Sequence, residues 1–343
     1  MHRRAEAPLA ARSARLRSLL PGLVPVLVLA VVATLLGRVV PLVGAPVLGI
    51  VLGALVGVFR RPGERQAPGL RLASRGVLQA GVVLLGTGLP LGQVLRVGGG
   101  SLPVMLGTLA VALAGAATLG RLLGLPSGIR TLVGVGTGIC GASAIAAVTS
   151  VLSVAEADVA YAIGTIFTYN VAAVLAFPAI GHLLGLSQHA FGLWAGTAVN
   201  DTSSVVAAAY SYGTSAGSYA VVVKLTRSLM IVPICLLLAA LSARRRTSDG
   251  VGSVRPWRLV PPFIVGFVLA SIVDTLGLVP SSWHGPLTWL AVFCTTVALS
   301  SIGLTTDPAA LRRAGARPLM LGGLLWVLVA VSSLGLQAVT GTL

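Results

Sequence analysis

Apolar runs of about twenty residues dominate the chain, and short polar stretches that hold most of its charged residues separate them. A run of about twenty apolar residues is long enough for a helix to cross the hydrocarbon layer of a membrane. The pattern therefore predicts an all-α polytopic membrane protein with ten or eleven transmembrane helices. The expected helices are 21–37, 43–59, 76–95, 101–120, 131–153, 159–180, 191–211, 217–241, 259–277, 287–304 and 318–341.

The composition excludes a soluble globular domain. Hydrophobic residues make up 56% of the chain, charged residues only 9%, and the mean hydropathy is +0.97, whereas soluble domains carry about 25% charged residues. We expect one membrane domain over 21–343, preceded by a basic cytoplasmic tail at 1–20. The first apolar run is followed at once by further spans and not by a cleavage site, which favours a retained helix over a signal peptide.

The net charge of +16 is explained by where the basic residues fall. With the N-terminus inside, only Arg38 and Arg96 face the outside, and only Lys224 and Arg227 lie within predicted spans. Cytoplasmic segments that are rich in Lys and Arg are typical of multi-pass proteins. The chain is thus expected in the plasma membrane, the inner membrane of a bacterial cell, with the lipid bilayer as its partner and no nucleic acid. The remaining basic residues are arginines at 3, 4, 12, 15, 17, 60, 61, 65, 71, 75, 121, 130, 244, 245, 246, 255, 258, 312, 313 and 317.

The stretch 181–190 does not fit this charge pattern, because it has no Lys or Arg on its expected inner side. The segment 191–211 is therefore either a clean span or a re-entrant, broken element. If it is re-entrant, one further element must also fail to cross, so that the later arginines stay inside.

Four glycines fall within eight residues, at Gly134, Gly136, Gly138 and Gly141. Small residues can mark close helix packing, but so dense a run favours a broken helix. Non-helical backbone at membrane depth survives only where it is buried in protein or lines a cavity, and a broken helix there offers N–H groups to an anion or carbonyl groups to a cation. Candidate substrate-binding residues of this block are Gly136, Thr137, Gly138, Cys140, Gly141 and Ser143.

A second polar block, Asn200, Asp201, Thr202, Ser203 and Ser204, is set in apolar sequence, and all five residues are candidate substrate ligands. An ionisable residue within a membrane segment indicates a functional site.

Lys224 and Arg227 lie three residues apart and so share one helix face. Three roles stay open for them: contact with substrate, an ion pair with Asp201, or snorkelling of Lys224 towards the interface.

Three blocks together resemble the YeiH-like family of proposed sulfate exporters: Gly-x-Gly-x-Cys-Gly-x-Ser-Ala-Ile at 136–145, Asn-Asp-Thr-Ser-x-Val-Val-Ala-Ala at 200–208, and Lys-Leu-Thr-Arg at 224–227. The segment from Ile302 to Asp307 and the following Leu-Arg-Arg-Ala-Gly resemble a late helix of that family, and the resemblance covers about 20–341. Members of the family commonly have His where this chain has Asn200, which weighs against a proton-linked role at that position.

The resemblance implies a secondary transporter of the wider group that holds bile-acid sodium symporters and cation/proton antiporters, with inverted five-helix repeats and broken, crossing helices. Two sets of five helices that start on opposite sides would give repeat halves of about 43–180 and 191–341, and would pair 131–153 with 287–304. A competing alignment sets Gly136, Thr137, Ser143 and Ala147 against Gly196, Thr197, Ser203 and Ala207, sixty residues later, and rests on few identities.

The candidate residues suit a small anion of the sulfate or sulfonate class, because they offer fixed positive charge and many N–H and O–H donors. Asp201 could hold a cation in place, carry a coupling proton or bind a coupling sodium ion. The rival function is a sodium- or proton-coupled cation antiporter that uses Asp201 as its carrier.

No enzyme, resident cofactor or metal site is expected. The histidines fall in the tail or in loops, far from Ser143, and a nucleophile needs a base within reach. The three cysteines lack CxxC spacing, and no GxxxxGK[ST] motif is present, so gradients would drive transport. Transport direction and a homodimeric state stay open.

Overall fold

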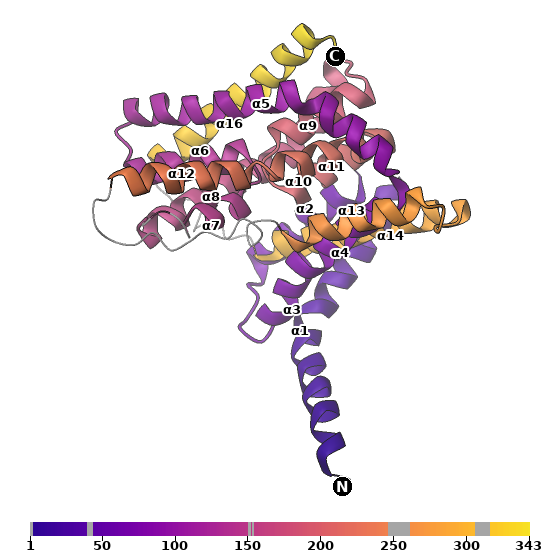
Figure 1. Ribbon diagram of the computed structural model, residues 1–343. Coiled ribbons are helices and arrows are strands. Elements are labelled where there is room, and N and C mark those ends of the chain that lie inside the picture. The colour runs from indigo at the N-terminus through magenta and orange to yellow at the C-terminus, as the bar shows by residue number, and fades with distance from the viewer. Residues whose placement is uncertain (1–2, 40–43, 150–151, 153, 246–260, 306–315) are drawn as a thin grey trace.

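The computed structural model describes residues 3–39, 44–149, 152, 154–245, 261–305 and 316–343 (Figure 1). Every regular element in these ranges is a helix. Six helical segments are long and apolar enough to cross a membrane, and Ala45–Phe59 and Pro262–Thr275 are shorter apolar helices. The expectation of an all-α polytopic membrane protein is confirmed.

One group of helices, called here the α2 bundle, contains α1 (Arg3–Val39), α2 (Ala45–Phe59), α13 (Pro262–Thr275) and α14 (Ser281–Thr305). A composite helix completes it, formed by α3 (Ala67–Arg71), a π-helical turn (Leu72–Val77), α4 (Leu78–Leu85) and a 3₁₀ turn (Gly86–Gly88). The N-terminal end of α1 projects away from all the other helices (Figure 1). From Arg3 onwards, the predicted tail at 1–20 is therefore helical and forms the first part of α1.

Small residues let the backbones of the α2 bundle approach closely. A Cβ added at Gly303 would lie 2.2 Å from the carbonyl oxygen of Ile50, and one at Gly53 would lie 2.4 Å from that of Ser300. Without a hydrophobic driving force between helices in lipid, such backbone contact is a main source of helix association. The glycines hold α2 and α14 side by side along their length.

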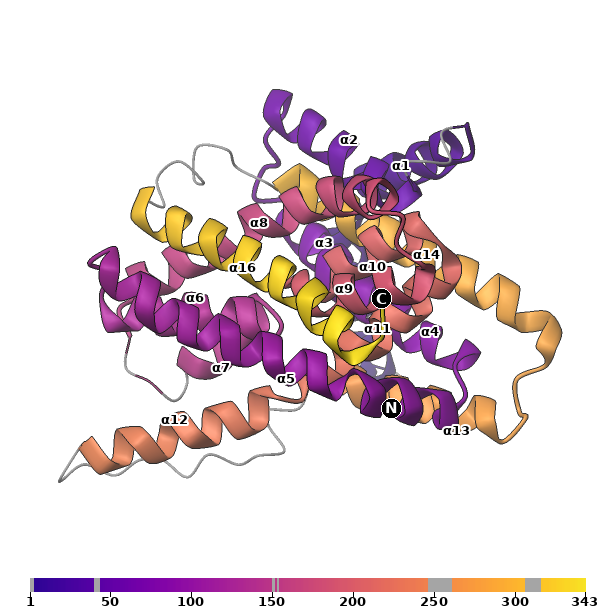
Figure 2. The same ribbon diagram turned by 90° about the horizontal axis from the view of Figure 1, so that it is seen from above.

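A second group, the hairpin bundle, contains α5 (Leu91–Leu122), α8 (Glu156–Leu183), α11 (Thr214–Ser228) and α16 (Ala316–Thr340), and α12 (Ile231–Arg245) extends from α11. Figure 2 shows α5 and α16 crossing the upper face of the molecule, with α9 and α11 beneath them. Four short helices pack against these long ones: α6 (Ser127–Gly138), α7 (Ala142–Thr149), α9 (Gln188–Ala198) and α10 (Thr202–Tyr212).

The helices α9 and α10 form a re-entrant hairpin. Tyr212 at the end of α10 stacks on Phe191 near the start of α9 with ring centroids 3.8 Å apart, and its hydroxyl donates to the carbonyl oxygens of Gly181 and Leu186. Both ends of the hairpin therefore lie beside the end of α8. The segment 188–212 turns back and does not cross.

The helices α6 and α7 form a second re-entrant hairpin at the opposite end of α8. A Cβ on Gly128, in the first turn of α6, would contact Val154 and Asp158, where α8 begins. Because α8 runs the length of the bundle between the two hairpins, they enter from opposite sides. This places Asp158 on the side of Arg130, and it places 181–190, which has no Lys or Arg, on the opposite side.

Several predicted helix limits are wrong. The predicted helix 76–95 ends early, because the composite helix stops at Gly88. The predicted helix 101–120 begins earlier than expected, because glycines 98–100 are part of α5 and do not break it. The predicted 131–153 and 217–241 are each divided, and α14 is continuous although it was paired with 131–153. The break between α6 and α7 and the break between α9 and α10 lie sixty residues apart, as in the competing alignment. The repeat halves themselves stay a prediction, and Asp307 lies outside the described residues.

Candidate functional site

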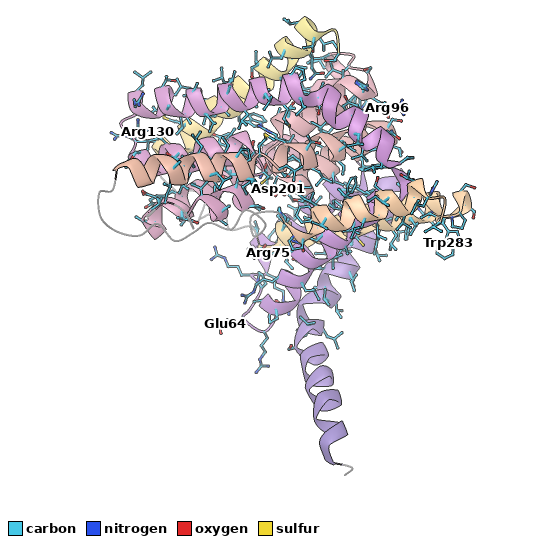
Figure 3. The ribbon with its side chains drawn as sticks, viewed as in Figure 1. Glu64, Arg75, Arg96, Arg130, Asp201 and Trp283 are labelled. Carbon is cyan, nitrogen blue, oxygen red and sulfur yellow. The ribbon has the colours of Figure 1, made fainter. Side chains whose placement is uncertain are left out.

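The tips of the two hairpins meet in the middle of the hairpin bundle. The tips are Ile139–Gly141 and Val199–Asp201, and a Cβ on Gly141 would lie 3.7 Å from both the Asn200 carbonyl oxygen and the Asp201 Cβ. Gly141 has a φ of +71°, which glycine adopts without strain. In Figure 3, Asp201 lies between Arg130 at one end of the bundle and Arg96 at the other.

Lys224, on α11, joins the two tips. Its ammonium group donates to the carbonyl oxygens of Ile139 and Val199, each at 2.9 Å, and the side chain is fully buried. Ile139 and Val199 are the C-cap residues of α6 and α9. One cation therefore binds the carboxyl ends of both inward-running half-helices.

Arg227 repeats this arrangement one turn further along α11. Its Nη2 donates to the Thr137 carbonyl oxygen at 3.0 Å, its Nη1 donates to the Thr197 carbonyl oxygen, and the side chain is fully buried. The four carbonyl groups come in two pairs, Thr137 with Thr197 and Ile139 with Val199, and each pair is sixty residues apart. The two hairpins thus present equivalent groups to one helix.

The charges at the tips add up to a net positive site. Each helix end carries about half an elementary charge, negative at the carboxyl end and positive at the amino end. The carboxyl ends of α6 and α9 contribute roughly −1, the amino ends of α7 and α10 roughly +1, Lys224 and Arg227 together +2, and Asp201 −1. The sum of about +1 makes the tips a net positive site.

The amino ends of α7 and α10 differ in how they are satisfied. Asp201 caps α10: its carboxylate accepts from the Ser203 N–H at 2.9 Å and from the Ser203 hydroxyl, while its own N–H donates to Asn170 Oδ1 at 3.1 Å. At the other tip, Ala142 and Ser143 begin α7 and are exposed. The first N–H groups of a helix lack intrahelical partners, so α7 offers an accessible positive end beside Asp201.

Three buried polar atoms at the tips have no hydrogen-bond partner among the described residues: Thr137 Oγ1, Asn200 Oδ1 and Arg227 Nε. Thr137 is 1% exposed and Asn200 is 2% exposed. An unpartnered buried polar group costs about 1–3 kcal/mol. Their gathering at one place indicates a site that a polar ligand or another arrangement of the hairpins would satisfy.

The structure brings most of the predicted site residues to this one place. Gly136 and Gly138 instead serve packing, against Ile145 and Leu109 respectively. Cys140, Thr202, Ser203 and Ser204 are buried at or beside the tips, and Ser143 is the exposed member. Two alternatives for the cations are wrong: Lys224 points to the tips and does not snorkel, and the Asp201 carboxylate bonds to Ser203 and not to Lys224 or Arg227.

Sequence reasoning missed the polar residues that support the tips from neighbouring helices. Asn170 on α8 holds the Asp201 backbone, and Ser333 on α16 lies 2.7 Å from the Thr197 hydroxyl, with Gln337 Nε2 donating to Ser333 at 3.3 Å. Each is a single buried polar residue in an apolar helix. That signal was available in the sequence, because isolated polar residues at membrane depth indicate functional or interhelical contacts.

Asp274 is a buried carboxylate outside the hairpin bundle. It lies at the end of α13, its side chain is only 4% exposed, and it pairs with His284 of α14 at 2.8 Å. The pair ties two helices of the α2 bundle together, away from the hairpin tips.

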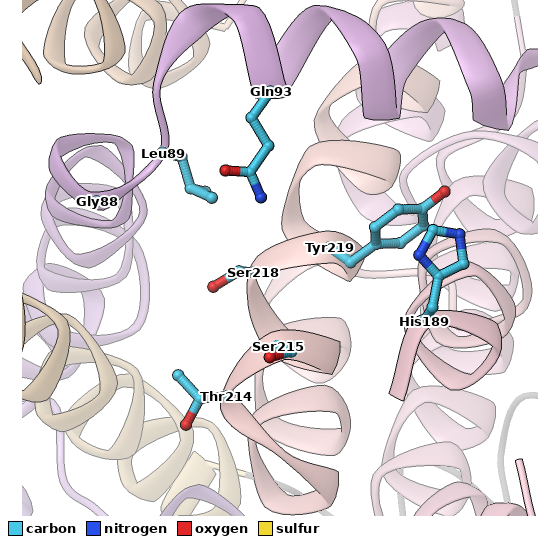
Figure 4. A pocket seen from close by; sticks show the side chains of 8 residues that line it. All are labelled: Gly88, Leu89, Gln93, His189, Thr214, Ser215, Ser218 and Tyr219. Atoms are coloured by element: carbon cyan, nitrogen blue, oxygen red, sulfur yellow. The ribbon is translucent and has the colours of Figure 1, made fainter. Parts of the chain in front are cut away.

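A cavity of about 310 Å³ opens at the end of the bundle where α5, α9 and α11 begin (Figure 4). Its lining mixes polar and apolar surface and has no carboxylate: Gly88, Leu89, Gln93, His189, Thr214, Ser215, Ser218 and Tyr219. Ser218 and Tyr219 belong to the same helix as Lys224, so the cavity lies along α11, towards the Arg96 end from the tips.

The chain is similar to proteins named only as membrane proteins. The family model described as conserved hypothetical protein 698 matches residues 21–322. A UPF0324 membrane protein from Streptococcus agalactiae is 40% identical over 331 residues, covering 94% of this chain and 98% of the relative. Relatives from Streptococcus pyogenes, 42% identical with 94% and 97% covered, and from Fusobacterium nucleatum, 38% identical with 93% and 98% covered, carry the same family name. No solved structure matches.

Proposed function

Because the chain belongs to the UPF0324 family of multi-pass membrane proteins, we propose that it is a secondary active transporter of a small anion of the sulfate or sulfonate class. The hairpin tips are its substrate site, and alternating access exports the anion from the cytoplasm. The N-terminus and the arginine-rich side are cytoplasmic in this proposal, as the distribution of basic residues favours.

The observation that carries the proposal is the meeting of two re-entrant hairpins beside two fully buried cations. Broken helices near the bilayer midplane are the usual substrate sites of secondary transporters, with half-helix amino ends directed at anionic groups. Here the amino end of α7 is accessible at Ser143, and the net charge of the tips is positive. A dianion would find N–H donors, hydroxyl donors and the unpartnered Arg227 Nε within one site.

The architecture also supplies a route for alternation. One hairpin enters from the arginine-rich side and the other from the opposite side, and both end on the same pair of cations. A shift of the hairpin bundle against the α2 bundle would open the tips to one side at a time. The cavity beside Ser218 lies on the side opposite the arginines and is suited to be the outer end of the path.

The experiment is charge movement on a solid-supported membrane, with the purified protein in proteoliposomes. Jumps of sulfate, sulfite, thiosulfate and taurine are compared with jumps of sodium and of pH. The proposal expects a current with one or more of the anions that disappears in protein-free liposomes and falls in Arg227→Met. A current produced only by sodium or pH would refute it.

A second candidate is a cation antiporter that uses Asp201 as carrier. One observation favours it: Asp201 is partly exposed, whereas both cations are fully buried and bound to carbonyl groups. The same recording decides between them, because this function predicts currents with sodium or pH steps and none with the anions.

A further inference from the structure

The carboxyl ends of two half-helices that point at each other form the usual place for a bound monovalent cation. In transporters with broken helices, the unwound carbonyl groups and half-helix carboxyl ends coordinate sodium or protons, and rings of carbonyl oxygens replace the hydration shell of potassium in channels. In this protein the α6 and α9 ends bring together the carbonyl oxygens of Ile139 and Val199, both 2.9 Å from a single nitrogen.

That nitrogen is Nζ of Lys224 and not a bound ion. Lys224 is the only lysine in the chain, and its ammonium group fills the space between the two C-cap carbonyl groups with the side chain fully buried. An ammonium ion carries the same charge as potassium and has a similar preference for carbonyl oxygens at this distance. Lys224 therefore takes the position, the charge and the ligands that a free cation would take.

We propose that the two C-cap carbonyl groups are a monovalent-cation site that Lys224 occupies as a tethered cation, so that the protein needs no sodium or potassium ion to hold its hairpin tips together. The proposal concerns the site itself. Its consequence for transport, that anion movement is not coupled to a monovalent metal cation, rests on the proposed function.

The geometry makes a specific prediction about removing the side chain. Lys224→Ala deletes the ammonium group and the three carbons next to it, and leaves two carbonyl groups at two negative helix ends without a partner. The vacated space has the length of n-propylammonium and gives a small cation access to the carbonyl pair. Lys224→Met removes the charge but fills most of that space.

Thermal unfolding of the full-length protein in detergent tests the site. The midpoint is measured in choline chloride and in sodium, potassium, ammonium and n-propylammonium chloride at equal ionic strength. Wild type and Lys224→Met are expected to show no difference between these salts. Lys224→Ala is expected to rise, relative to choline, by about 5 °C at a cation concentration about 100-fold above its dissociation constant.

Thr226→Ala is the matched control on the same helix, because the Thr226 hydroxyl donates to the Val222 carbonyl oxygen of its own helix and lies beside Gly98 of α5. It should be independent of the cation. An equal response in Lys224→Met or Thr226→Ala, or no response in Lys224→Ala, would overturn the proposal.

A measurement on the wild type keeps the proposal testable if Lys224→Ala does not fold. The anion current is recorded with sodium and potassium fully replaced by choline, and it should be unchanged. An anion current that disappears in choline overturns the tethered-cation proposal and leaves the proposed function standing. If no anion gives a current at all, the proposed function fails, and the thermal unfolding of the Ala and Met variants still decides the site.

Discussion

Thr137 and Thr197, sixty residues apart, present their backbone carbonyl oxygens to the two terminal nitrogens of one guanidinium, that of Arg227. Each threonine lies in the last turn of a half-helix that ends inside the protein. The pair makes Arg227 the joint between two hairpins that enter from opposite sides. The guanidinium fork suits this task, because it offers several N–H donors in fixed directions.

Replacing Arg227 should therefore destabilise the protein strongly. Arg227→Met leaves two buried carbonyl groups unpaired, which costs about 2–6 kcal/mol at the usual 1–3 kcal/mol for each group. Arg227→Lys keeps the charge but loses the fork and should fall between Arg227→Met and wild type. Chemical unfolding in detergent measures the loss. Arg96→Met is the control, because Arg96 is exposed and bonds within its own helix; an equal loss there would contradict the role of Arg227.

The hydroxyl pair of Thr197 and Ser333 should fix the last turn of α9. Ser333→Ala removes the α16 partner of the Thr197 hydroxyl and also leaves Gln337 Nε2 without its acceptor. We expect a loss of about 1–2 kcal/mol and a reduced transport rate at saturating substrate. Ser332→Ala provides the comparison, since the Ser332 hydroxyl bonds to Val329 of its own helix. Equal behaviour of the two variants would show that the contact across helices is unimportant.

The α2 bundle depends on backbone contact between α2 and α14. Gly303→Ala would place a methyl group 2.2 Å from the Ile50 carbonyl oxygen, which is backbone and cannot rotate away. We expect a loss of about 1–3 kcal/mol, as for overpacked cores. Gly335→Ala meets nothing within 4 Å in α16 and should be neutral or stabilising by up to about 1 kcal/mol. Thermal unfolding of both variants measures the difference, and equal midpoints would contradict this packing argument.

The sequence indicates where the backbone breaks but not where it goes next. The glycines before Gly141 and the polar residues at 200–204 predict both breaks, because they lower the cost of non-helical backbone and offer groups to satisfy it. A broken apolar segment looks the same in sequence whether it crosses or turns back. The return of α9–α10 is fixed by contacts of Tyr212 with Phe191 and Gly181, which no local pattern contains.

The partners of the two cations were beyond prediction for the same reason. Charge and spacing place Lys224 and Arg227 on one helix face, but their acceptors are backbone carbonyl groups of two other segments, freed only by the breaks. Every residue has a backbone carbonyl group, so the sequence does not show which of them will accept a hydrogen bond from a side chain. The sequence therefore singled out residues that lie together in the structure, and two of the three roles it left open for Lys224 and Arg227 do not match their contacts.

The re-entrant topology predicts which side each hairpin end faces. Ala155 precedes the first residue of α8, His182 lies in its last turn, and both are exposed. With a cytoplasmic N-terminus, Ala155→Cys should react with a membrane-impermeant maleimide only from the cytoplasmic side, and His182→Cys only from outside. Eleven simple crossings predict the reverse for both. Both substitutions are made in Cys294→Ser, because Cys294 is only half-buried whereas Cys140 and Cys235 are buried, and Cys294→Ser alone is the control.

Asp201 should act as a helix cap and a negative neighbour of the substrate, not as a proton carrier. Asp201→Asn keeps an acceptor for the Ser203 N–H, and Asn caps helices about as well as Asp, so stability should change little, whereas Asp201→Ala should lose about 1 kcal/mol. Because the substitution with Asn removes a charge that repels an anion, the KM for the transported anion should fall several-fold with its pH dependence unchanged. Concentration series of the anion-induced current, recorded at several pH values, measure both quantities. A current that loses its pH dependence in Asp201→Asn would instead make Asp201 the coupling group, and the cation antiporter would become the better account of the hairpin tips.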